Sequence, residues 1–258
     1  MILCFDVGNT ETTIGCFDGE VMKGHWRITT DAARTPDELG MVVHALLTRD
    51  GIAAGRISGI AIGSVVPPVT APLAEACRAW LGDLPVVIVD ARAGLPIALD
   101  VEEPLSVGAD RIINTLAASR LHGRDAIVVD LGTATTFDCI TRAGVFIGGV
   151  IMPGVRSSAD TLFRRTSKLP ATEIEAPKHV IGRRTEECIR SGVLYGAADA
   201  IDGVVRRIKG EWPGGEVPLV IATGGLAEAF EPYCREFDLV DPYLTLVGLR
   251  LSFELLSK

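Results

Sequence analysis

The stretch Asp6-Val7-Gly8-Asn9-Thr10 follows an apolar run at residues 1–5. A partial repeat, Asp130-Leu131-Gly132-Thr133-Ala134, follows a second apolar run at residues 126–129. Threonines and further apolar residues come after each stretch, so each is predicted to form the turn between two strands. The two aspartates are 124 positions apart in a chain of 258 residues. We interpret the stretches as two phosphate-binding hairpins, one in each half of the chain.

The composition is that of a globular protein, with 48% hydrophobic and 22% charged residues. A chain of this length has room for one large domain or for two domains of roughly 100–150 residues each. The net charge of −8 argues against nucleic-acid and anionic-membrane partners, because those surfaces attract clustered Lys and Arg. A small anionic ligand is compatible with this charge, since a few local dipoles and one or two Arg can hold it.

The cysteines are predicted to be reduced thiols, most of them in the core. No C-x-x-C pair occurs among Cys4, Cys16, Cys77, Cys139, Cys188 and Cys234. A zinc site or a disulfide framework is therefore disfavoured. The first residues lead straight into a strand without a signal-peptide pattern, and no apolar stretch is long enough to span a bilayer. These features predict a cytoplasmic protein.

The first half of the chain predicts a β-β-β-α-β-α-β order. Its expected strands are residues 2–6, about 12–17, about 21–28, 59–64 and 85–89. The first helix is marked by Thr35-Pro36-Asp37-Glu38, which has the hydroxyl, the proline and the glutamate of a capping box. A second amphipathic helix, with Leu73 and Trp80 on its apolar face, is expected between the last two strands.

The second half repeats this order with larger insertions. Its expected strands are residues 125–130, 135–140, 145–151, 218–222 and a short one near Leu239. Its expected helices are residues 155–165, 185–209, a helix of roughly ten residues that follows Gly225, and residues 243–256. The repeated order implies two similar α/β domains with a cleft between them. We place these domains at residues 1–115 and 116–258, with the helix at 109–121 as the crossover.

Several common nucleotide and hydrolase signatures are missing. The sequence has no G-x-x-x-x-G-K-[ST] loop, no G-x-G-x-x-G fingerprint after a strand and no G-x-S-x-G elbow. Its four histidines are scattered without metal-ligand spacing. If the protein handles phosphate, turn amides, hydroxyls and carboxylate-held cations must bind it.

The first hairpin has the groups for that task. Gly8 allows a tight turn and close approach of a phosphate to the backbone. Thr10, Thr12 and Thr13 offer hydroxyl and amide donors, and Asp6 can hold Mg²⁺ that neutralises phosphate oxygens. The alternative is an ordinary Asx-type hairpin turn. Repetition of the acid-x-glycine-hydroxyl order in both halves favours the phosphate site.

Three further sites have both a functional and a structural interpretation, and a fourth, Arg27, has only a structural one. Glycines in Thr223-Gly224-Gly225 allow an adenine ring to lie against the backbone, or they make a simple βα turn. In Gly108-Ala109-Asp110-Arg111, Asp110 is a candidate general base and Arg111 a carboxylate ligand, although an acid at a helix N-terminus is also favoured by the helix dipole. Thr185 is an N-cap or a substrate contact, and Arg27 fits an exposed strand charge.

Taken together, these motifs resemble the type III pantothenate kinases, members of the sugar kinase/Hsp70/actin superfamily, over essentially the whole chain. Asp-x-Gly marks only the superfamily, whereas Gly-Ala-Asp-Arg with the long second hairpin marks the family. The resemblance rests on these residues: 6–10, Trp26-Arg27, 64–68, 108–111, 130–138, Gly148-Gly149, Pro153-Gly154, 168–170 and 222–225.

The resemblance implies a duplicated RNase H-like, actin-like ATPase fold and ATP-dependent phosphorylation of pantothenate, the first step of coenzyme A synthesis. It implies that Asp110 is the proton acceptor and that Gly108, Ala109, Asp110, Arg111 and Thr185 contact pantothenate. The implied ATP-binding residues are Asp6, Val7, Gly8, Asn9, Thr10, Glu11, Thr12, Thr13, Thr133, Gly224 and Gly225. Asp6 would serve Mg²⁺, and Asp130 would hold K⁺ or NH₄⁺. Family members are homodimers. The dimerisation helices are expected in the second domain.

The sequence departs from the family pattern at one segment. Family members often have a Tyr-Asp-Asn-Pro run shortly before Gly-Ala-Asp-Arg, and its tyrosine contacts pantothenate. Residues 98–104 read Ala-Leu-Asp-Val-Glu-Glu-Pro instead, without a tyrosine. A different pocket edge is therefore expected there.

Two other functions fit part of the pattern. Another phosphotransferase of the superfamily, such as a sugar kinase or a polyphosphate-type hydrolase, would keep both hairpins but would not need Gly-Ala-Asp-Arg. A non-enzymatic nucleotide-binding regulator would not need to keep Asp6, Asp110 and Asp130. A coupled assay of ATP consumption with and without pantothenate separates the three.

Overall fold

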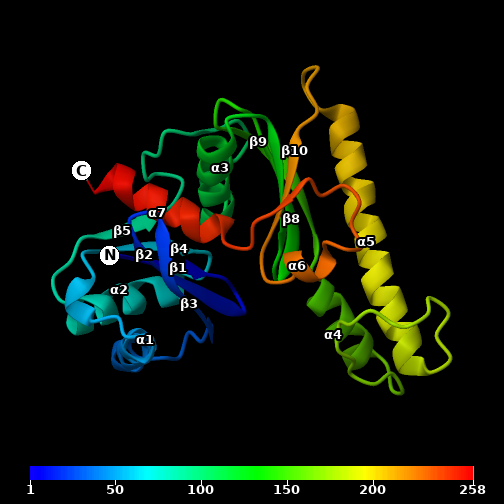
Figure 1. The fold of residues 1–258 in the computed structure, drawn as a ribbon, viewed down its shortest axis with the longest axis horizontal. Helices are drawn as coiled ribbons and strands as arrows, with labels where there is room; N and C mark the ends of the chain where they lie inside the picture. The colour runs from blue at the N-terminus through cyan, green and yellow to red at the C-terminus, as the bar shows by residue number, and fades with distance from the viewer. Residues whose placement is uncertain (258) are drawn as a thin grey trace. The chain divides into compact units, whose positions relative to one another are not determined.

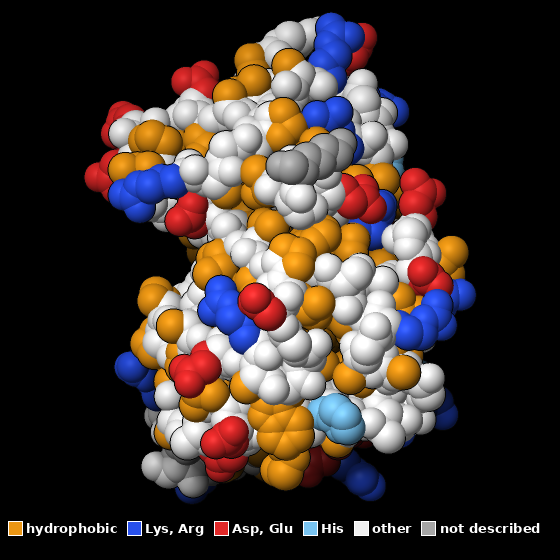
Figure 2. All heavy atoms as spheres, turned by 90° about the vertical axis from the view of Figure 1, so that its left-hand side faces the viewer, with side chains coloured by type: hydrophobic (Ala, Val, Ile, Leu, Met, Phe, Trp, Pro, Cys, Tyr) orange, Lys and Arg blue, Asp and Glu red, His pale blue; other side chains and the backbone are white. Residues whose placement is uncertain are grey.

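The computed structural model describes residues 1–257, and the chain divides into two compact units (Figure 1). The first unit contains Met1–Leu121, Gly144–Phe146 and the chain from Tyr243 onward. The second unit contains His122–Ala143 and Ile147–Pro242. On the face drawn in Figure 2, acidic and basic side chains are interspersed with apolar ones.

The first unit is built on a five-stranded sheet with the order β3-β2-β1-β4-β5. Strands β1, β2 and β3 form an antiparallel meander, and β4 and β5 continue the sheet in parallel with β1. The bounds are β1 (Ile2–Val7), β2 (Glu11–Asp18), β3 (Val21–Thr29), β4 (Gly59–Ser64) and β5 (Val86–Val89). The predicted strand order along this half of the chain is confirmed.

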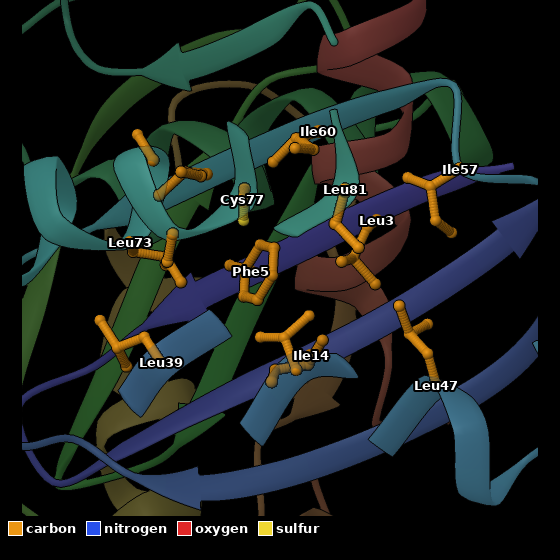
Figure 3. Packing of buried hydrophobic residues seen from close by; sticks show 14 of the residues in the cluster. Leu3, Phe5, Ile14, Leu39, Leu47, Ile57, Ile60, Leu73, Cys77 and Leu81 are labelled. Atoms are coloured by element: carbon orange, nitrogen blue, oxygen red, sulfur yellow. The ribbon is translucent and has the colours of Figure 1, made fainter. Parts of the chain in front are cut away.

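Helices α1 (Pro36–Arg49) and α2 (Pro67–Leu81) cover one face of this sheet. The predicted capping box is present at the start of α1, because Glu38 N donates to Thr35 Oγ1 at 3.3 Å and Thr35 N donates to Glu38 Oε2 at 2.8 Å. Apolar side chains from β1, β2 and both helices meet in a buried core (Figure 3). Burying each such side chain stabilises the fold by about 1.5–3 kcal/mol.

Helices α3 (Ala109–His122) and α7 (Leu244–Leu256) cover the opposite face. Ile113 of α3 and Leu249 of α7 are buried with Cys4 of β1 and Ala61 of β4. The predicted boundary at residue 115 differs from this partition, since all of α3 up to Leu121 and all of α7 belong to the first unit. The reason is burial, because the apolar face of α7 covers β1 and β4.

Gly248→Ala is expected to lower the free energy of unfolding by about 1–3 kcal/mol. A Cβ added at Gly248 of α7 would lie 2.6 Å from the carbonyl oxygen of Ile113 and 3.2 Å from Ala117 Cβ, both on α3. Gly55→Ala is the control in the same unit, because a Cβ added there meets no atom within 4 Å. Urea unfolding compares the two variants, and equal stabilities would contradict the close contact of α7 with α3.

The remaining elements of the first unit are short. They are η1 (Ala54–Arg56), β6 (Ala98–Leu99) and η2 (Pro104–Ser106). Strand β6 pairs in parallel with Val145 and Phe146, the first residues of β9, which belong to the first unit. An open pocket at η2 is lined by Glu103, Pro104, Leu105 and Ser106.

The second unit repeats the strand order of the first. Its strands are β7 (Ala126–Leu131), β8 (Ala134–Ile140), β9 (Val145–Pro153, from Ile147 onward), β10 (Leu219–Thr223) and β11 (Leu239–Val240), in the order β11-β10-β7-β8-β9. Strand β7 therefore takes the position of β1, and β10 takes that of β4. The common order confirms the duplication that the two hairpins predict.

The helices of the second unit are α4 (Val155–Arg165), α5 (Thr185–Glu211) and α6 (Ala227–Phe230). Helix α6 has four residues instead of the expected ten or so. Pro232 follows closely and has no N–H with which to continue the helical hydrogen bonds. Across residues 1–257, none of the helices has the length and apolar character required to cross a membrane.

Candidate active site

The first hairpin of the sequence is the connection between β1 and β2. Asp6 pairs with Thr13 and Val7 with Thr12, and the turn is closed by Gly8 N, which donates to Glu11 O at 3.1 Å. A Cβ added at Gly8 would lie 3.0 Å from that carbonyl oxygen, so the tight turn favours glycine. Asn9 and Thr10 are exposed at the tip.

The threonines of this hairpin lie on two different faces. Thr12 is buried, and its Oγ1 lies 2.8 Å from Oγ1 of Thr30, so its hydroxyl is used inside the unit. Thr13 lies on the opposite face with Asp6, its partner on β1. Side-chain contacts with a ligand on the Asp6 face can therefore come from Thr13, whereas Thr12 can contribute only its backbone there.

Asp110 is brought to the face of the sheet that carries Asp6. Gly63 of β4 is the register partner of Asp6, and Ile113 in the first turn of α3 fills the space above Gly63. Asp110 stands at the start of the same helix, where Arg111 N donates to its Oδ1 at 2.8 Å. Gly108 leaves room for this carboxylate, since a Cβ added there would lie 2.5 Å from Asp110 Oδ1.

Burial raises the pKa of Asp110 above the ordinary range of an aspartate, and the hydrogen bond from Arg111 N and the positive charge of Arg111 offset part of this effect. The guanidinium of Arg111 lies over the ring of Phe146, 4.8 Å from its centroid. Thr115 Oγ1 donates to the carbonyl of Arg111 at 2.8 Å and supports the first turn of α3. A partly buried carboxyl with a raised pKa has the properties of a general base.

The second hairpin connects β7 and β8 in the second unit. Asp130 pairs with Thr136 of β8 and with Thr223 of β10, and Gly132 N donates to Ala134 O at 3.0 Å. Thr133 is exposed, and its carbonyl accepts a hydrogen bond from Ser157 Oγ at 2.9 Å. This carbonyl also occupies the space where a Cβ of Gly154 would lie. Pro153-Gly154 therefore supports the second hairpin from the start of α4.

Gly224 lies against Asp130, which the sequence alone does not show. Its φ of +88° favours glycine, and an added Cβ would collide with Asp130 Oδ1 and lie 2.8 Å from Leu131 N. Thr223, the register partner of Asp130, is buried, and its Oγ1 has no hydrogen-bond partner within residues 1–257. Carboxylate and hydroxyl oxygens are ligands that suit a hard cation. The oxygen donors of Asp130 and Thr223 are thus of the kind that suits the cation implied for Asp130 by the family resemblance.

Thr185 is the first residue of α5 and is exposed. Glu187 Oε2 accepts hydrogen bonds from Arg183 N at 2.8 Å and from Arg184 N at 3.3 Å, so the helix start is held by Glu187. Arg184, rather than Thr185, occupies the N-cap position. The N-cap interpretation of Thr185 is therefore wrong, and its hydroxyl is exposed at the start of the helix.

Comparisons with known proteins agree with these features. A family model described as "Type III pantothenate kinase" matches residues 2–207. Proteins named type III pantothenate kinase from Acidothermus cellulolyticus and Streptomyces griseus are 45% and 46% identical to the chain, and the matches cover 98% of both chains in each case. The protein of that name from Moorella thermoacetica is 43% identical, with 98% of this chain and 99% of that protein covered.

Solved structures show the same fold at low sequence identity. A protein described as a Baf family transcriptional activator from Campylobacter jejuni has a TM-score of 0.59 at 17% identity, covering 98% of this chain and 97% of that chain. The activator of the 2-hydroxyisocaproyl-CoA dehydratase from Clostridium difficile has a TM-score of 0.57 at 12% identity, covering 99% and 95%. With the repeated strand order, these similarities identify the duplicated RNase H-like arrangement of the actin-like ATPase fold. Because the family model matches residues 2–207 and the relatives match 98% of its length, the chain belongs to the type III pantothenate kinase family.

Proposed function

We propose that this chain phosphorylates pantothenate with ATP, the first step of coenzyme A synthesis, and that Asp110 is the general base. The observation that carries the assignment of the base is the position of Asp110. Its carboxyl is partly buried at the start of α3, has a raised pKa, and belongs to the face of the sheet that carries Asp6. Formation of ADP that depends on added pantothenate tests the reaction.

In the proposed step, Asp110 accepts the proton of the primary hydroxyl of pantothenate. The hydroxyl oxygen forms a bond to the γ-phosphorus of ATP, and the bond from that phosphorus to the β,γ-bridging oxygen breaks, which releases ADP. The proton acceptor contributes about 10²–10⁴-fold to such a reaction. Positioning of the reactants and stabilisation of charge supply most of the remainder.

The two hairpins are the proposed phosphate-binding loops. Residues 6–13 form the first loop, with Asp6 as the carboxylate for Mg²⁺, and Thr133 lies in the second loop. Oxygen donors at the end of β1 suit Mg²⁺, which when bound with ATP neutralises charge on the phosphate oxygens. Gly224 and Gly225 at the end of β10 are the proposed adenosine contacts. We assign pantothenate contacts to residues 108–111 and to Thr185.

Asp130 is the proposed ligand of the monovalent cation, K⁺ or NH₄⁺, together with Thr223. Asp130→Ala is expected to abolish most of the activation by K⁺, because it removes the only charged oxygen donor we assign to this cation. The measurement is the reaction rate over a titration of KCl, with tetramethylammonium chloride keeping the ionic strength constant. A response to K⁺ equal to that of the wild-type enzyme would mean that Asp130 is only a turn residue.

We further propose a cytoplasmic homodimer. Leu162 and Phe163 of α4 are 40% and 48% exposed, and Ile151 of β9 is 64% exposed. Large exposed apolar side chains near one another in the chain are typical of association surfaces. Light scattering after gel filtration is expected to give twice the mass of 27.4 kDa, and Phe163→Glu is expected to give the monomer. A monomeric wild-type protein at micromolar concentration would contradict the proposal.

A further inference from the structure

Arg27 of β3 is aligned across the first sheet with two residues of the proposed phosphate loop at residues 6–13. It is the register partner of Thr13 on β2, and Thr13 is the register partner of Asp6 on β1. Register partners on neighbouring strands point to the same face of a sheet, with Cβ atoms about 4.5–5.5 Å apart. The side chains of Asp6, Thr13 and Arg27 therefore form a continuous row across three strands.

In this row, Asp6 and Thr13 are half-buried and Arg27 is exposed. Trp26 and Ile28, the neighbours of Arg27 along β3, belong to the core under α1 and α2, so Arg27 points to the other face. On that face, Leu246 of α7 packs over Gly15 of β2, and Tyr243 contacts His25 of β3 through a 3.3 Å hydrogen bond. Arg27 is the next outward-facing residue beyond His25, and it is exposed.

The side chain of Arg27 makes no hydrogen bond or ion pair with any of residues 1–257. Asp6, the acid in its row, is two strands away, which is about 10 Å at the usual strand spacing. Glu11, on the same face, pairs with Thr29, two residues further along β3. The net charge of the chain is −8, yet Arg27 puts a positive charge beside the predicted phosphate loop. An anionic phosphate is expected to bind at this loop.

We propose that Arg27 binds a phosphate group of the nucleotide from the β3 side of the first loop. A guanidinium offers planar, paired donors that match phosphate oxygens, and each charge-assisted hydrogen bond of this kind is about twice as strong as a neutral one. Asp6 with Mg²⁺ would then hold the phosphates from one side of Thr13, and Arg27 would hold them from the other. The proposal rests on the assignment of residues 6–13 as a phosphate loop.

The test compares Arg27→Gln with Lys23→Gln, which removes a positive charge from the same strand outside the row. Arg27→Gln is expected to raise the KM for ATP at least about tenfold and to leave the KM for pantothenate within about twofold. Calorimetric titration with MgATP alone is expected to show the same loss of affinity. Arg27→Lys keeps a point charge without the paired donors, so its KM and affinity for ATP are expected to lie between those of the wild-type enzyme and Arg27→Gln. Lys23→Gln is expected to match the wild-type enzyme in all three measurements.

Three outcomes would overturn the proposal. Unchanged constants for both substrates would make Arg27 a plain exposed charge of the strand. A raised KM for pantothenate with an unchanged KM for ATP would mean that Arg27 serves the carboxylate of the acceptor. An equal loss for Arg27→Gln and Lys23→Gln would point to general electrostatics. Asp6→Asn distinguishes failure of the Arg27 proposal from failure of the proposed phosphate loop. If Asp6→Asn loses affinity for ATP and Arg27→Gln does not, only the role of Arg27 is rejected. If both variants keep the wild-type affinity, the phosphate loop itself is rejected.

Discussion

Asp110→Asn is expected to lower kcat by at least about 100-fold, because asparagine cannot accept the proton of the pantothenate hydroxyl. The amide keeps the shape of the side chain and an oxygen that can accept the hydrogen bond from Arg111 N. MgATP affinity is therefore expected to change little. Steady-state kinetics at saturating ATP and pantothenate give kcat, and calorimetric titration gives the affinity for MgATP.

Asp83→Asn is the control for Asp110→Asn, since Asp83 is an exposed carboxylate in the loop after α2. It is expected to keep the wild-type kcat. A kcat of Asp110→Asn near that of this control would remove Asp110 from the role of the base.

The raised pKa of Asp110 also determines the sign of its contribution to stability. A carboxyl whose pKa is higher in the folded than in the unfolded state favours folding at low pH, and this contribution is lost as the pH rises through the folded pKa. At pH 7 the buried charge is therefore a cost, and Asp110→Asn is expected to unfold at or above the wild-type temperature. The acid limb of kcat against pH is expected to lie above the ordinary aspartate pKa of about 3.9.

Asp6→Asn is expected to lower kcat/KM for MgATP by roughly 100-fold or more, because it removes the carboxylate proposed to hold Mg²⁺ and leaves the hairpin geometry in place. The loss is expected to shrink as the concentration of free Mg²⁺ rises, since the variant would bind the ion more weakly. Initial rates over a matrix of ATP and Mg²⁺ concentrations measure both effects.

Asp18→Asn provides the control for Asp6→Asn at the far end of the same hairpin. Asp18 is exposed and its side chain forms an ion pair with Arg56 at 3.4 Å, so removal of its charge is expected to leave the kinetics unchanged. A dependence on Mg²⁺ that is the same in Asp6→Asn as in the wild-type enzyme would contradict the metal role of Asp6.

Local signals made much of the fold predictable. The capping box at Thr35 and Glu38 fixes the start of α1, and it is made by residues three positions apart. The hairpin of β1 and β2 follows from an apolar run, a glycine and a second apolar run. Repetition of these signals in the second half was enough to predict the duplicated fold.

Contacts between residues far apart in the sequence could not be predicted from the sequence alone. Helix α7 reads as an apolar helix, but only the tertiary structure shows that it covers β1 and β4 with Leu246 and Leu249. Gly224 reads as a βα turn, and its contact with Asp130 depends on the parallel pairing of β10 with β7. The strand that carries Arg27 was likewise predictable from the sequence, but the register that aligns Arg27 with Thr13 and Asp6 was not.

The most direct test of this account is the coupled assay of ADP formation from ATP, with and without pantothenate, in the presence of Mg²⁺ and K⁺. We expect ADP formation to depend on pantothenate and to match the amount of phosphorylated product one to one. Sugars offered in its place are expected to give only the background rate. ADP formation that is independent of pantothenate, or no turnover by a folded protein that binds MgATP, would contradict the account.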